Sequence, residues 1–120
     1  NFWEEIDFPA EERVHFARMI QSDIRETELE SLKSGFYVIE ALEASLFVFL
    51  KNDTYRDTVL SIINLGDDTD TGAAISGGLA GLYYGIDGIP SKWVNSISRI
   101  DDIMALCASL NERYNENGIN

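Results

Sequence analysis

Apolar residues recur at helical spacing along most of the chain, and short polar breaks separate the apolar segments. Pro9 followed by two glutamates suits a helix start, because proline is tolerated in the first turn and acids there complement the helix dipole. We expect this first helix to run to about Leu32. Its apolar residues Phe16, Ile20 and Ile24 recur every four positions, which provides one stripe for burial.

The middle of the chain predicts two further helices. Residues 37–50 are almost all apolar or small, and this length favours a helix buried on most sides over a strand. Thr54 and Asp57 have the spacing of a capping box, which predicts a second helix start. That helix should end near Leu65, because Gly66 is a typical helix stop.

A helix rich in small residues is expected over residues 72–84. Ala73, Gly77, Gly81 and Gly85 are each four positions apart and therefore share one face. Glycines weaken a helix, so their presence predicts that another backbone approaches this face closely. The apolar run is shorter than the roughly 20 residues that a bilayer requires, which excludes a membrane span.

The C-terminal part predicts two more helices after a connection at residues 86–90. Ser91 is expected to cap a short helix that carries Trp93. Cys107 lies on the apolar face of the last helix, where we expect it to be buried. No credible run of alternating strands occurs, so the pattern as a whole predicts an all-α fold.

Composition narrows the function classes. The 120 residues include 9 basic and 21 acidic side chains, for a net charge of −12. Sequence-independent nucleic-acid binding needs a basic surface, and an anionic membrane would repel this chain, so neither partner is expected. The single cysteine, Cys107, excludes an internal disulfide and is compatible with a reducing, cytoplasmic setting.

Most acidic residues are expected to solvate the surface, but three of them fall within four positions between two apolar helices. Asp67, Asp68 and Asp70 would repel one another, because two carboxylates about 5 Å apart cost roughly 3 kcal/mol at an effective dielectric of 20. A cation would offset this repulsion, and oxygen ligands favour magnesium, manganese or calcium over zinc. Asp68 and Asp70 could face one ion only from an irregular backbone, because on a helix they would diverge. Thr71 could bind the ion or cap the following helix. The alternative is that these residues merely cap the next helix.

An EF-hand does not fit the acidic segment. A calcium loop that starts at Asp68 needs glycine at its sixth position and glutamate at its twelfth. Those positions hold Ala73 and Leu79. The spacing therefore excludes this kind of calcium site.

A magnesium-dependent phosphatase of the haloacid-dehalogenase type resembles the segment better. Residues 62–65 would form a strand, Asp68 and Asp70 would act as nucleophile and acid, and residues 101–102 would bind magnesium. That family expects threonine or valine where Gly72 stands. It also needs a parallel sheet, which the pattern does not predict.

A longer window, residues 65–90, resembles the C-terminal signature of the ADP-ribosylglycohydrolase family. The signature is a Gly-Asp-x-Asp-Thr core, a small-residue helix and a Tyr-Gly pair, and an upstream segment resembles the family's Ser-Gly-Tyr-Val…Leu-Glu-Ala. The corresponding residues are 68–71, 73–81, 84–85, 34–35 and 42–44. The family includes ADP-ribosyl-acceptor hydrolases and the dinitrogenase-reductase-activating glycohydrolase.

The resemblance implies an orthogonal all-α helical bundle with a centre of two Mg²⁺ or Mn²⁺ ions. Asp68, Asp70 and Thr71 would be metal ligands, with Asp70 bridging the ions. The ions would hold the ribose hydroxyls and a water. The implied reaction is hydrolysis of the N- or O-glycosidic bond between ADP-ribose and a protein or small-molecule acceptor.

The resemblance also places Gly35, Phe36 and Tyr37 at the substrate pocket. The segment between Gly35 and Leu42 is one residue longer than the usual family form, so either Phe36 or Tyr37 takes the lining position.

Two departures from the family pattern affect the predicted site. Asp67 stands where the family commonly has glycine, and we do not assign it to the metal. No Thr-Asp-Asp cluster precedes residue 64, although the family takes further ligands from such a cluster. We therefore expect residues 1–120 to be the C-terminal portion of a single domain that holds half a site. A missing N-terminal half or a second chain would complete it. The competing hypothesis is a non-catalytic interaction module.

Overall fold

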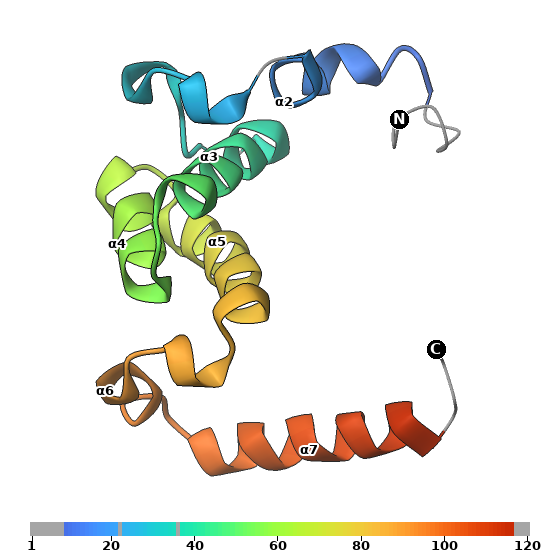
Figure 1. Cartoon of the computed structure of the whole chain (residues 1–120), viewed down its shortest axis with the longest axis vertical. Helices are drawn as coiled ribbons and strands as arrows, with labels where there is room; N and C mark the ends of the chain where they lie inside the picture. The colour runs from blue at the N-terminus through green and yellow to red at the C-terminus, as the bar shows by residue number, and fades with distance from the viewer. Residues whose placement is uncertain (1–8, 22, 36, 117–120) are drawn as a thin grey trace. The chain divides into compact units, whose positions relative to one another are not determined.

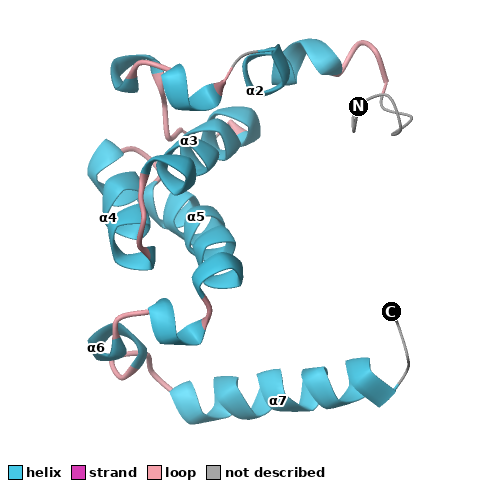
Figure 2. Ribbon diagram, in the orientation of Figure 1, coloured by secondary structure: helices cyan, strands magenta, loops and turns pink. Residues whose placement is uncertain are grey.

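The computed structural model describes residues 9–21, 23–35 and 37–116, and every regular element in these ranges is a helix (Figures 1 and 2). This confirms the predicted all-α class. The chain divides into two compact units, Asn1–Gly88 and Ile89–Asn120, which are described separately below.

The prediction of one continuous helix from Pro9 to Leu32 is wrong. The described part of this segment holds short elements instead: η1 (Arg13–Phe16), α2 (Ala17–Gln21), η2 (Ile24–Glu26) and η3 (Leu29–Ser31). Asp23 has an extended backbone, and its carboxylate accepts the Arg25 backbone N–H at 3.0 Å, which starts a new turn. Such side-chain bonds to the backbone compete with helix continuation. Ile24 is buried and Phe16 half-buried, while the side chain of Ile20 lies outside the described residues.

The ion pair at this break gives a pH prediction. The Arg25 side chain hydrogen-bonds to the Asp23 carboxylate and, with the Arg25 backbone N–H, lowers the pKa of Asp23 from 3.8 to about 2. Because the folded-state pKa is depressed, this pair stabilises the fold above pH 3.8 and loses its effect as the pH falls towards 2. An NMR titration should place the Asp23 midpoint near 2, and Arg25→Gln should return it towards 3.8. Equal midpoints in the two proteins would contradict the assignment.

Three helices form the core of the first unit: α3 (Val38–Lys51), α4 (Tyr55–Leu65) and α5 (Thr69–Tyr84). They pack against one another, with η2 against α3 (Figure 1). The predicted bounds hold for α3 and α4, whereas α5 begins three residues before the expected Gly72. The buried apolar cluster comprises Ile24, Leu32, Ala44, Phe47, Val48 and Ile62.

Helix α4 starts and stops as its end residues predict. The Thr54 hydroxyl accepts the Asp57 backbone N–H at 3.0 Å, which is the first half of a capping box. Gly66 follows the last turn with φ of 86°, a left-handed value that glycine adopts without strain.

The glycines of α5 admit side chains of α4 rather than its backbone. A Cβ at Gly77 would lie 3.3 Å from the hydroxyl oxygen of Tyr55, and one at Gly81 would lie 3.9 Å from the same ring. The closest approach is at Gly72, where a Cβ would lie 2.7 Å from Cγ1 of Ile62. The prediction that another backbone approaches the glycine stripe is therefore wrong, and the closest packing of α5 lies at Gly72, against side chains.

The second unit contains α6 (Ser91–Val94) and α7 (Ile100–Glu116). Ser91 is not the helix cap, because Pro90 occupies that position. Cys107 is exposed, so the prediction of burial is wrong. The four-residue α6 is too short to cover the seventeen-residue α7. Over the described ranges, no helix has the length and apolar character needed to cross a membrane.

Candidate metal centre

The acidic loop between α4 and α5 has an irregular backbone up to Asp68, whereas Asp70 lies inside α5. Gly66 has φ of 86° and Asp67 has φ of 55°, so two successive residues are left-handed. Asp68 follows with φ of −84° and ψ of 71°, and α5 begins at Thr69. The left-handed φ at Asp67 explains why glycine suits this position, since a Cβ is strained there.

The capping alternative fails for Asp68. Asp68 occupies the N-cap position of α5, yet its side chain accepts no backbone N–H from the first turn. Thr71 lies inside the helix and therefore does not cap it either. Asp70, in the first turn, is favoured by the positive end of the helix dipole.

Hydrogen bonding at the first turn of α5 holds the pKa of Asp70 below its usual value. The Asp68 side chain is the largest cause, and the backbone N–H groups of Asp70 and Thr71 come next. Two neighbouring carboxylates repel each other, so a bound cation would stabilise them in their charged form.

The donor set at this loop fits part of a magnesium or manganese site. Asp68 is half-buried, while Asp70 and Thr71 are exposed, and all three offer hard oxygen atoms. Over the described ranges, no group of three or more His, Cys, Asp and Glu side chains is placed to hold a metal ion. The described carboxylates alone therefore make an incomplete ligand set, and half a site stays a prediction.

The predicted substrate segment lies beside the acidic loop. The backbone N–H of Asp68 donates to the carbonyl oxygen of Ser34 at 2.9 Å, which joins residues 34 positions apart in the sequence. Gly35 is half-buried, and Tyr37 is 51% exposed at the N-cap of α3. Phe36 lies outside the described residues. The structure thus brings the flanks of the two predicted site segments together.

Ser34 is a residue of this region that sequence reasoning did not single out as a site residue. It is 1% exposed, and its hydroxyl lacks a hydrogen-bond partner among the described residues. The sequence feature that could have identified Ser34 is the Ser34-Gly35 pair, which resembles the Ser-Gly of the family's upstream segment.

His15, the single histidine, is exposed and lies near Tyr37, with its Nδ1 at 3.5 Å from the tyrosine hydroxyl. No hydrogen bond or ion pair joins it to the acidic loop among the described contacts.

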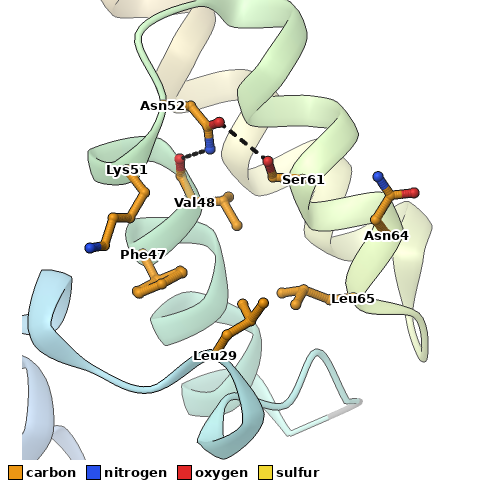
Figure 3. A pocket seen from close by; sticks show the side chains of 8 residues that line it. All are labelled: Leu29, Phe47, Val48, Lys51, Asn52, Ser61, Asn64 and Leu65. Atoms are coloured by element: carbon orange, nitrogen blue, oxygen red, sulfur yellow. Dashed lines mark hydrogen bonds between the residues drawn. The ribbon is translucent and has the colours of Figure 1, made fainter.

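A surface cavity of about 380 Å³ lies between η3, α3 and α4 (Figure 3). Leu29, Phe47 and Leu65 line one part of it, and Asn52 and Ser61 line another. Asn52 donates to the Val48 carbonyl at 2.7 Å and accepts from the Ser61 hydroxyl at 3.3 Å (Figure 3). No described carboxylate lines this cavity.

The phosphatase alternative does not survive this geometry. Residues 62–65, its required strand, form the last turn of α4. Its required parallel sheet is absent from the described residues, which contain no strand.

Comparison with known proteins identifies the class to which this fold and loop belong. A model of the ADP-ribosylglycohydrolase family matches residues 3–120, so the chain belongs to that family. ADP-ribosylarginine hydrolase Tri1 of Pseudomonas putida is 33% identical over 91 residues, which cover 76% of this chain and 24% of the relative.

Two further relatives carry names of other ADP-ribosyl hydrolases. The ADP-ribosyl-dinitrogen reductase glycohydrolase of Rhodospirillum rubrum is 34% identical over 65 residues, which cover 54% of this chain and 22% of the relative. Human ADP-ribosylhydrolase ARH3 is 29% identical over 101 residues, which cover 75% of this chain and 28% of the relative. The chain thus spans about a quarter of the length of these curated relatives.

Proposed function

We propose that this chain supplies the C-terminal part of a metal-dependent hydrolase that cleaves the glycosidic bond between ADP-ribose and its acceptor. The observation that carries the proposal is the position of Asp68 and Asp70 at the start of α5, where the Asp68 side chain accepts no backbone N–H of the first turn. The family membership and the names of the relatives support the same reaction class.

The proposed site takes two Mg²⁺ or Mn²⁺ ions, to which Asp68, Asp70 and Thr71 contribute oxygen ligands. When bound, such ions orient the ribose hydroxyls and position a water for attack on the anomeric carbon. Asp70 contributes its negative charge at the end of α5, where the helix dipole stabilises it. The remaining ligands come from residues outside the described cluster.

The proposed substrate is an ADP-ribosylated protein or a related small ADP-ribosyl compound. Ser34, which directly precedes Gly35, is hydrogen-bonded to Asp68 of the acidic loop, so Gly35 and Tyr37 stay our candidates for contacts with a sugar held there. The relatives are named for arginine and dinitrogen reductase acceptors, and the acceptor proposed for this chain is of the same kind.

A manganese titration with two isosteric variants tests the proposed site. Asp70→Asn should weaken Mn²⁺ binding by about tenfold or more, because it removes a charged ligand. Asp67→Asn removes the same charge one residue before Asp68 and should change the affinity less than about twofold. Electron paramagnetic resonance of free Mn²⁺ measures both affinities.

The two variants distinguish direct coordination of Mn²⁺ by Asp70 from general attraction of the cation to the acidic surface, because each variant removes one negative charge. If the two variants bind Mn²⁺ equally well, the cation only collects around the acidic surface. That outcome would favour the non-catalytic interaction module over the hydrolase.

A further inference from the structure

A backbone hydrogen bond connects the acidic loop to the segment before α3. The Asp68 N–H donates to the Ser34 carbonyl oxygen at 2.9 Å, while the Asp68 carbonyl accepts the Gly72 N–H at 3.1 Å. Asp68 is therefore held on one side by Ser34 and on the other by the first turn of α5. Its side chain accepts no N–H from that turn.

Gly72 is the point at which this turn packs into the core. A Cβ there would lie 2.7 Å from Cγ1 of Ile62 and 3.0 Å from the Ser34 hydroxyl oxygen. The Gly72 carbonyl accepts from the Ser76 hydroxyl at 2.8 Å and lies 3.4 Å from the Ser45 hydroxyl, which also donates to it. The three serines are at most 1% exposed. Contacts on several sides thus fix the backbone beneath the acidic loop.

The hydroxyl group of Ser34 does not stabilise the fold. It is buried and lacks a partner among the described residues, and a buried unpaired hydroxyl is unfavourable. The small size of the side chain is what the contact with Gly72 requires, since a larger group would push the Ser34 carbonyl away from Asp68.

We propose that Ser34 is a positioning residue for the acidic loop: its carbonyl holds the Asp68 backbone, and its small side chain lets α5 pack at Gly72. The effect on metal binding rests on the proposed function. The Ser34–Asp68 hydrogen bond would couple the segment that begins at Ser34 to the acidic loop, so that the two move together. A shift of the Ser34 backbone then displaces Asp68 and weakens metal binding.

Four variants of the whole 120-residue chain test this contact. Gly72→Ala places a methyl group against Ile62 and Ser34, whereas the matched control Gly78→Ala points into open space on the same helix. Ser34→Val adds bulk at the other side of the contact, and Ser34→Ala keeps the side chain small. If Gly72→Ala fails to fold, Ser34→Val still tests the contact from the other side.

The first readout is amide hydrogen exchange without added metal. Gly72→Ala and Ser34→Val should speed exchange at the Asp68 amide by about tenfold or more relative to the Val48 amide in the core of α3. Gly78→Ala and Ser34→Ala should leave that ratio unchanged. Equal acceleration at Asp68 and Val48 would show general destabilisation and overturn the positioning role.

The second readout is Mn²⁺ affinity in the same variants. Gly72→Ala and Ser34→Val should weaken Mn²⁺ binding about tenfold, while Gly78→Ala and Ser34→Ala should match the unaltered chain. Unchanged affinity in the first two would overturn the link to the metal. Absence of Mn²⁺ binding in the unaltered chain contradicts the proposed function instead, and hydrogen exchange then decides the positioning role by itself.

Discussion

The 120-residue chain by itself is expected to release no ADP-ribose from an ADP-ribosylated arginine protein, even with Mg²⁺ or Mn²⁺ present. Asp68 and Asp70 are the candidate carboxylate ligands, and the described residues form no group of three or more His, Cys, Asp and Glu side chains that could hold a metal ion. A binuclear centre needs more ligands than two carboxylates and a hydroxyl supply. An incomplete ligand set would leave the ribose and the water without fixed positions, so the loss should be complete rather than partial.

Release of free ADP-ribose, followed by chromatography, measures this prediction. A full-length ADP-ribosylarginine hydrolase serves as the positive control on the same substrate, and addition of EDTA defines the metal-dependent part. EDTA-sensitive turnover by these 120 residues, abolished by Asp70→Asn, would contradict the expectation of half a site. It would show that residues outside the described ranges complete the ligand set.

Ile62→Ala is expected to destabilise the first unit by about 3–4 kcal/mol, which is a large part of the usual stability of a domain. Ile62 is 0% exposed and belongs to the apolar cluster shared by α3 and α4. Its Cγ1 also occupies the space that the missing side chain of Gly72 leaves open. The truncation would therefore create a cavity at the contact that seats the first turn of α5.

The adjacent residue provides a matched control. Ile63→Ala makes the same chemical change in the same helix, but Ile63 is 41% exposed and should lose less than about 1 kcal/mol. Denaturant unfolding followed by circular dichroism measures both free energies. Similar losses in the two variants would mean that Ile62 does not carry the packing described above.

Local signals predicted the elements whose start and end depend on neighbouring residues. Thr54 and Gly66 mark the ends of α4 because a cap and a left-handed glycine act within one turn. The first predicted helix failed because the Asp23 side chain bonds to a nearby backbone N–H, a competition that apolar spacing does not reveal. Cys107 failed because burial depends on what covers α7, and helical spacing carries no such information.

The candidate site divides in the same way. Asp68, Asp70 and Thr71 were predicted from the motif, and their clustering in sequence already required a charge-balancing partner. Asp68 follows the left-handed Gly66 and Asp67, whereas Asp70 lies inside α5, so an ion shared by Asp68 and Asp70 stays a prediction.

The sequence by itself determined the all-α class, the extents of α3 and α4, and the acidic loop with its candidate ligands. Only the tertiary structure decided that Ser34 holds the Asp68 backbone and that Gly72, rather than the glycine stripe, is the tightest contact. The physical reason is the distance along the chain over which each interaction acts. Caps, turns and charge repulsion act between residues close in the chain, whereas hydrogen bonds and packing between distant segments exist only after the helices have met.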